Sequence, residues 1–214
     1  MIFKFIIILF SGLIGYLIGS VNFAIVISEF VFHKDIRNYG SKNAGMTNML
    51  RTFGKLPAFF TLIGDFSKGI ISVLISNLLF YILIGTEAPA YANGIVGICA
   101  LLGHVFPIFY KFKGGKGILV SAGVLIMMDL VIFLIAFSVF LLILIISRIV
   151  SLSSIIATVS YPIALLIKKC IMNSSLFDIF IETFLAAIIS IIIIYMHKDN
   201  IKRLIKKDEP KLGK

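Results

Sequence analysis

The sequence predicts an all-α integral membrane protein with seven transmembrane helices, its N-terminus outside and its C-terminus in the cytoplasm. The chain of 214 residues is 60% hydrophobic and only 14% charged, whereas a soluble domain is nearer half apolar and a quarter charged. Its apolar residues fall in long runs, and its Lys and Arg residues gather between certain runs. A soluble protein and a disordered chain are therefore excluded, and residues 1–214 are expected to form a single polytopic membrane domain.

A helix needs about 20 apolar residues to cross the bilayer core. In chain order, the predicted spans are Phe5–Ser28, Leu56–Ile84, Ala92–Tyr110, Gly117–Met128, Leu130–Ser147, Ile149–Ile167 and Phe177–Met196. The first carries no charge, lacks the cleavage site of a signal peptide, and has a G-x-x-x-G pair at Gly15 and Gly19 that predicts close helix packing. In the second, Asp65 and Lys68 can pair three residues apart, and we interpret them as structural. His104 in the third is likewise interpreted as structural.

The distribution of cations supports splitting the apolar stretch from Gly117 to Ser147 at Asp129. Short cytoplasmic loops collect Lys and Arg, and five cations follow the first span, three follow the third and seven follow the last. These three segments share one side of the membrane only if that stretch forms two helices. Two features fit less well: the fourth span has only 12 residues, and Lys168 and Lys169 would lie outside.

The first basic segment, Asp35 to Arg51, is polar and rich in turn formers. It carries hydroxyl and amide side chains at Ser41, Asn43, Thr47 and Asn48. Thr47 or Asn48 could cap a short helix that carries Arg51. The segment is interpreted either as a phosphate-handling loop or as a solvated turn with basic anchors for lipid headgroups.

The second basic segment contains three glycines, Gly114, Gly115 and Gly117, directly before an apolar helix. Backbone N–H groups at a helix N-terminus bind phosphate, and Lys116 adds a positive charge. The segment is not a nucleotide-binding P-loop, because Gly117 stands where Ser or Thr should follow the lysine. A simple turn at the membrane boundary is the alternative.

The third basic segment starts at the end of the last span. On a continuing helix, His197, Asn200 and Ile201 share a face, and Arg203 lies close to Asn200. His197 could act as an acid, a base or a phosphate ligand. The alternative is a polybasic stretch held by acidic lipids, at about 1 kcal/mol per cation.

Three polar, basic segments on one side favour an enzyme that handles phosphorylated lipid precursors. A small anion transporter is a second hypothesis, although transporters place broken helices and charges near the bilayer midplane. Another phosphate-handling lipid enzyme is a third; an Asp-Gly-dependent CDP-alcohol phosphotransferase is excluded, because no aspartate precedes a glycine. We expect no metal, no cofactor and no nucleic-acid partner.

The three segments together resemble the bacterial acyl-phosphate:glycerol-3-phosphate acyltransferase family (PlsY). That family carries a motif close to D-I-R-x-x-G-S-G-N-x-G-A-T-N-x-x-R, then F-K-G-G-K-G, then H-x-x-N-I-x-R-L with a downstream glutamate. The matching residues are Asp35 to Arg51, Phe112 to Gly117, and His197 to Leu204 with Glu209.

The resemblance implies a seven-helix enzyme of the bacterial cell (inner) membrane with its active site on the cytoplasmic face. It would transfer an acyl group from acyl phosphate to the 1-position of glycerol 3-phosphate, giving lysophosphatidic acid and phosphate. Its partners would be these substrates, membrane lipids and the soluble phosphate acyltransferase (PlsX) that makes acyl phosphate.

The resemblance also implies roles for individual residues. Those expected to be catalytic are Ser41, Arg51, Lys116, His197 and Asn200. Those expected to bind substrate phosphate are Gly114, Gly115, Gly117, Asn43, Ser154 and Arg203. Glu209 is expected to be structural. The proton of the attacking hydroxyl would pass either to His197 or to the leaving phosphate, and we favour the phosphate.

The chain departs from the family pattern at three positions. Lys42 and Lys207 stand where the family has glycine, and Met46 stands where it has alanine. Lys42 lacks the backbone freedom of glycine beside Ser41, so the local geometry of that loop need not follow the family. Lys42 also adds a cation, and activity is still expected.

Overall fold

The computed structural model describes residues 2–212, which contain helices and, within that range, no strand. The chain divides into two compact units, one ending at Met127 and the other beginning at Met128. The α-helices of the first unit are α1 (Ile2–Ser20), α2 (Phe23–Phe32), α3 (Met46–Phe53), α4 (Lys55–Ile84), α5 (Ala90–Val105) and α6 (Ile118–Met128), whose last residue begins the second unit. Two 3₁₀ turns, η1 (Ile36–Asn38) and η2 (Ile108–Tyr110), also belong to it. The second unit contains α7 (Leu130–Ser147), α8 (Val150–Ile171), α9 (Leu176–Met196) and α10 (Lys198–Ile205).

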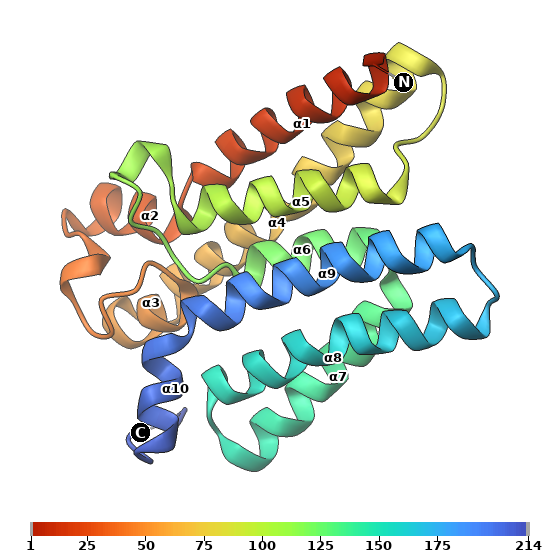
Figure 1. Ribbon diagram of the computed structural model, residues 1–214. Helices are drawn as coiled ribbons and strands as arrows, with labels where there is room; N and C mark the ends of the chain where they lie inside the picture. The colour runs from red at the N-terminus through yellow and green to blue at the C-terminus, as the bar shows by residue number, and fades with distance from the viewer. Residues whose placement is uncertain (1, 213–214) are drawn as a thin grey trace. The chain divides into compact units, whose positions relative to one another are not determined.

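Glycines bring the helices of the first unit into close contact, and α1 runs beside α5 (Figure 1). A Cβ atom on Gly19 would overlap the carbonyl of Ala100, and one on Gly15 would lie 3.0 Å from Val96. The close packing predicted for this G-x-x-x-G pair is therefore confirmed. Helix α6 packs in the same way, since a Cβ on Gly123 would overlap the carbonyl of Phe66 on α4.

The first predicted span is wrong in one respect, because it is broken into α1 and α2. The side chain of Asn22 accepts a hydrogen bond from the N–H of Ile25 at 3.1 Å and so caps α2. Asn at this position offers a local acceptor that competes with helix continuation. The two residues between the helices, Val21 and Asn22, are neither Gly nor Pro.

The predicted split at Asp129 is confirmed. Helix α6 ends at Met128, and the Asp129 side chain caps α7 by accepting from the N–H of Ile132 at 3.1 Å. Among the described residues, six helical segments have the length and hydropathy to cross a membrane: Ile2–Phe32, Lys55–Ile84, Ala90–Tyr110, Leu130–Ser147, Val150–Ile171 and Leu176–Met196. Helix α6 has only 11 residues, which is about 16 Å of helix and falls short of a hydrocarbon core of about 30 Å.

In the second unit, the two lysines that fitted the charge distribution poorly are both paired with acids. Lys168 lies 2.5 Å from Asp129, and Lys169 lies 2.7 Å from Glu182. Their positive charges are therefore compensated within the fold.

Candidate active site

The loop that carries Ser41 is organised around the side chain of Asn48. Its Oδ1 accepts the N–H of Ser41 at 2.9 Å, while its Nδ2 donates to the carbonyls of Ile36, Tyr39 and Asn43 at 3.3, 2.9 and 3.0 Å. Asn48 is only 2% exposed. Because one buried amide satisfies four backbone groups of the loop, it fixes the loop's path from η1 to α3.

The prediction that Thr47 or Asn48 caps the following helix is wrong. Helix α3 begins at Met46 with Gly45 as its N-cap, and no side chain caps it. Asn48 instead lies inside α3, pointing its amide back at the loop. Gly40 is required beneath that amide, since it adopts φ 54° and a Cβ atom there would overlap the Asn48 oxygen.

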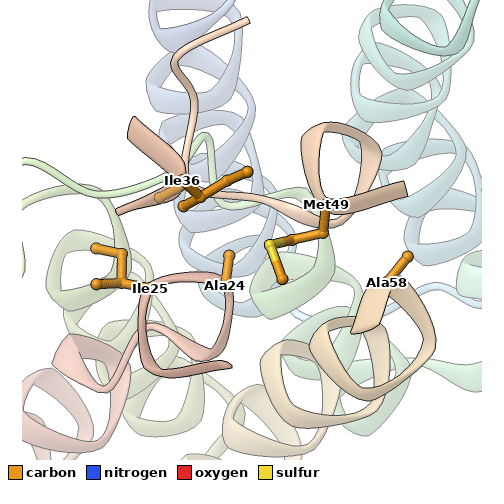
Figure 2. Close-up of a cluster of buried hydrophobic side chains, with 6 residues drawn as sticks. Ala24, Ile25, Ile36, Met49 and Ala58 are labelled. Carbon is orange, nitrogen blue, oxygen red and sulfur yellow. The ribbon is translucent and has the colours of Figure 1, made fainter. Parts of the chain in front are cut away.

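A buried apolar cluster contains residues on both sides of this loop in the chain. Figure 2 shows its members Ala24 and Ile25 of α2, Ile36 of η1, Met49 of α3 and Ala58 of α4, and all five are at most 3% exposed. Met49 follows Asn48 directly, so the same short helix turn anchors the loop through both a polar and an apolar side chain. Ser41 and Arg51, in contrast, are exposed.

Arg37 connects the loop that carries Ser41 (residues 39–45, the Ser41 loop) to the loop that carries Gly114 and Gly115 (residues 111–117, the glycine loop). The sequence did not reveal this role. Its guanidinium binds both carboxylate oxygens of Asp35, the shortest contact being 2.7 Å. It also donates to the carbonyls of Tyr110 and Lys113 at 3.0 and 3.1 Å. The hydrogen bond from Arg37 holds the pKa of the Asp35 carboxyl below its usual range, against the opposing effect of burial. The carbonyls of Tyr110 and Lys113 lie more than 70 residues from Arg37 in the chain, so local spacing could not predict these two contacts.

The glycine loop folds back along the end of α5. Gly114 N–H donates to the carbonyl of Val105 at 3.1 Å, and Gly115 N–H donates to the carbonyl of His104 at 3.2 Å. These two N–H groups are therefore used inside the fold. Gly114 and Gly115 allow the loop backbone to approach its neighbours closely. A Cβ on Gly114 would overlap the carbonyl oxygen of His104, and one on Gly115 would overlap the carbonyl oxygen of Ala44.

Gly117 makes the turn into α6. It adopts φ 85°, and a Cβ there would overlap Leu101. The first turn of α6 has N–H groups without intrahelical acceptors, and the half-buried Lys116 precedes it. Positive charge and helix N–H groups thus lie together at this end of α6, an arrangement that suits an anion.

In the second unit, Glu209 holds the C-terminal segment in place. Its Oε1 accepts from Ser151 Oγ at 2.8 Å and from Asn200 Nδ2 at 2.5 Å, and its Oε2 accepts from Arg203 Nε at 2.7 Å. Burial alone would raise the pKa of Glu209, but these hydrogen bonds outweigh burial and bring the pKa below its ordinary value. The contacts agree with the structural role expected for Glu209 and show that Asn200 and Arg203 also serve it.

His197 lies at the junction of α9 and α10 and is only 3% exposed. Its Nδ1 lies 2.8 Å from the carbonyl of Ile193. A carbonyl can only accept, so Nδ1 carries the proton, and in the neutral ring Nε2 carries the lone pair. Asn200, one turn further on, and Ser154, near the start of α8, are also buried.

The two lysines that replace family glycines both adopt left-handed backbone conformations. Lys42 has φ 58° and Lys207 has φ 60°. The loops therefore keep the glycine-like geometry at these positions, at a cost of roughly 1–2 kcal/mol each for a residue with a Cβ atom.

Comparison with known proteins identifies the family. The family model described as glycerol-3-phosphate acyltransferase matches residues 9–207. Two similar relatives are the glycerol-3-phosphate acyltransferases of Staphylococcus carnosus (strain TM300), 37% identical, and Staphylococcus aureus (strain Newman), 36% identical. Each alignment spans 201 residues and covers 94% of this chain and 95% of the relative.

Two solved structures of PlsY (YgiH), an integral membrane glycerol 3-phosphate acyltransferase, share the fold. The glycerol 3-phosphate form is 34% identical and superposes with a TM-score of 0.81, covering 96% of both chains. The lysophosphatidic acid form is 32% identical with a TM-score of 0.78, covering 96% of this chain and 95% of the other. The family model and these relatives show that this chain belongs to the glycerol-3-phosphate acyltransferase family. Because it also has apolar helices long enough to cross a membrane, it is an integral membrane acyltransferase.

Proposed function

We propose that this enzyme transfers an acyl group from acyl phosphate to the 1-position of glycerol 3-phosphate, releasing lysophosphatidic acid and inorganic phosphate. The observation that carries this proposal is the loop fixed by Asn48, which holds the exposed Ser41 and, through Arg37, is tied to the loop bearing Lys116. The related structures in glycerol 3-phosphate and lysophosphatidic acid forms support the same acceptor and product. The anion transporter hypothesis loses its basis, because the family is an acyltransferase family.

An acyl phosphate is a mixed anhydride and needs no further activation. The 1-hydroxyl of glycerol 3-phosphate would attack the acyl carbonyl carbon, a new ester C–O bond would form, and the bond to the phosphate oxygen would break. The protein must overcome the repulsion between two phosphate groups and stabilise the negative charge on the carbonyl oxygen. We assign Arg51, Lys116 and the first-turn N–H groups of α6 to this charge stabilisation, and Ser41 and Asn43 to orienting the substrates.

The hydroxyl proton has two possible acceptors. The lone pair on His197 Nε2 is suited to accept it, and the departing phosphate is itself a base. We favour the phosphate, with His197, Asn200, Ser154 and Arg203 contributing hydrogen bonds to substrate. If this is right, His197→Ala keeps much of its activity and its rate depends on pH as that of the wild type does; a pH dependence that is present in the wild type and lost in His197→Ala would identify His197 as the base.

We also propose the membrane arrangement. Helix α6 would be the fourth of seven spans and shorter than the others, the N-terminus would lie outside, and the three basic segments with the active site would face the cytoplasm of a bacterial cell. The compensation of Lys168 and Lys169 by Asp129 and Glu182 supports placing that pair outside. A soluble phosphate acyltransferase would supply the acyl phosphate.

Purified protein in lipid vesicles tests the reaction directly. With acyl phosphate and glycerol 3-phosphate, we expect lysophosphatidate and free phosphate to form in equal amounts. Acyl-CoA in place of acyl phosphate should give no product. Product formation only from acyl-CoA would refute the donor assignment, and formation from neither donor would refute the function.

The assignment of the anion-binding residues has its own test. Arg51→Ala and Lys116→Ala should each lower kcat/KM by about 100-fold or more, as expected when a charge-stabilising donor is removed. Lys206→Ala, which removes an exposed cation of the tail, is the matched control and should retain at least half of the activity. Equal losses in all three variants would contradict the assignment.

A further inference from the structure

A buried polar cluster in the first unit lies beneath both active-site loops. It consists of Asp65 and Lys68 on α4 and His104 on α5, whose exposed fractions are 1%, 2% and 3%. Burying charged groups costs several kcal/mol per ion unless other contacts compensate. Apolar side chains would pack the helices equally well, so packing alone does not explain the charged groups. The polar contacts of the cluster do.

Lys68 makes contacts that no apolar residue could replace. Its Nζ lies 2.9 Å from Asp65 Oδ1 and donates to the carbonyls of Gly19 and Val21 at 3.0 and 2.7 Å. These carbonyls lie where α1 stops and α2 has not begun, so they lack the donors of a continuing helix. Lys68 therefore stabilises the break between α1 and α2.

The break is connected to the Ser41 loop through Asn22. This side chain is fully buried, caps α2, and donates from Nδ2 to the carbonyl of Ala44 at 3.4 Å. Ala44 lies in the Ser41 loop, directly before Gly45. A shift of the break would therefore move the backbone that follows Ser41.

The cluster reaches the glycine loop through His104. Lys68 Nζ lies 2.9 Å from His104 Nδ1, and because an ammonium group has no lone pair, Nδ1 must accept and Nε2 carries the proton. The Nε2 edge of the ring faces Gly115, whose N–H also donates to the His104 carbonyl at 3.2 Å. A Cβ atom on Gly115 would overlap both His104 Nε2 and the Ala44 carbonyl, so the two loops meet on this histidine.

We propose that Lys68 and His104 are positioning residues that fix the position of the Ser41 loop relative to the glycine loop. The inference rests on the proposed function for its catalytic consequence, but the geometry it describes is independent of the reaction. Without the pair, the α1–α2 break and the His104 ring lose their fixed positions, and both loops shift. A displacement of about 1 Å costs on the order of 100-fold in rate.

The test combines activity with hydrogen exchange in the full-length protein. The double variant Asp65→Asn/Lys68→Met removes both charges and leaves no unpaired ion. We expect kcat to fall about 100-fold and exchange of residues 41–45 and 113–117 to rise at least tenfold. The control is Asn93→Ala, which removes the 3.0 Å hydrogen bond between Asn93 on α5 and Asn77 on α4. It should lower Tm without changing kcat or loop exchange.

A conservative substitution separates positioning from bulk packing. His104→Asn keeps an oxygen able to accept from Lys68 in place of Nδ1, whereas His104→Phe keeps only the ring. We expect His104→Asn to retain at least tenfold more kcat than His104→Phe at equal amounts of folded protein. This pair also serves as the test if the double variant does not fold.

The outcomes separate this proposal from the proposed function. If the wild-type protein makes no lysophosphatidate, the function fails, and the exchange measurement still decides the positioning role. If the double variant lowers Tm but leaves loop exchange unchanged, or if His104→Asn and His104→Phe lose kcat equally, the positioning role is refuted.

Discussion

Replacing Asn48 by Ala should release the Ser41 loop. The substitution removes the acceptor of the Ser41 N–H and the two N–H donors that are shared among the carbonyls of Ile36, Tyr39 and Asn43. With a net contribution of about 0.5–1.5 kcal/mol for each of these three groups, the loss is roughly 3 kcal/mol. Since 1.4 kcal/mol corresponds to a factor of ten, the opening equilibrium of the loop should increase by about a hundredfold.

Amide hydrogen exchange measures this opening directly. The informative amides are those of Tyr39 and Lys42, which donate to Ile36 and Tyr39 at 3.1 and 2.9 Å, together with that of Ser41. Their protection should fall by up to about a hundredfold in Asn48→Ala, and kcat/KM should fall with it. Thr61→Val is the control, because it removes one buried hydrogen bond within α4, to Pro57 at 2.8 Å, without touching the loop.

A second substitution isolates the donor half of the amide. Asn48→Asp keeps an oxygen for the Ser41 N–H but turns a carboxylate oxygen toward three carbonyls, so it should be at least as harmful as Asn48→Ala. The reasoning is refuted if protection in Asn48→Ala stays within about threefold of the wild type, or if Asn48→Asp restores it.

The remaining predictions concern the backbone and the tail. Lys42→Gly and Lys207→Gly should each stabilise the protein by up to about 1 kcal/mol, measured as a rise in Tm, because both lysines adopt φ near 60°; a fall in Tm would contradict this. Because the folded pKa of Glu209 lies below its ordinary value of 4.5, its contribution is complete above pH 4.5 and is lost as the pH falls through the folded pKa. The protection factor of the Leu212 amide, which donates to the carbonyl of Arg148 at 2.7 Å, should therefore fall at low pH in the wild type. In Glu209→Gln this protection factor should already be lower at neutral pH and should change little with pH, and a pH dependence like that of the wild type would contradict the assignment.

Local properties of the sequence were sufficient for the class of fold and for the position of the site segments. The length of an apolar run and the charge of its flanks act on each segment separately, which is why the six long apolar segments of the described residues and the break at Asp129 could be predicted. The same holds for the close packing at Gly15 and Gly19, since small residues allow helices to approach whatever their partner is.

The tertiary structure decided how the site segments are held. Asn48 was expected to cap a helix but instead binds a loop that precedes it, and the N–H groups of Gly114 and Gly115 bind carbonyls at the end of α5. Arg37 reaches the carbonyls of Tyr110 and Lys113 from a distant part of the chain. Many groups in the chain are chemically able to pair with a given hydrogen-bonding side chain, and only the packing of the helices determines which of them lies close enough to bind.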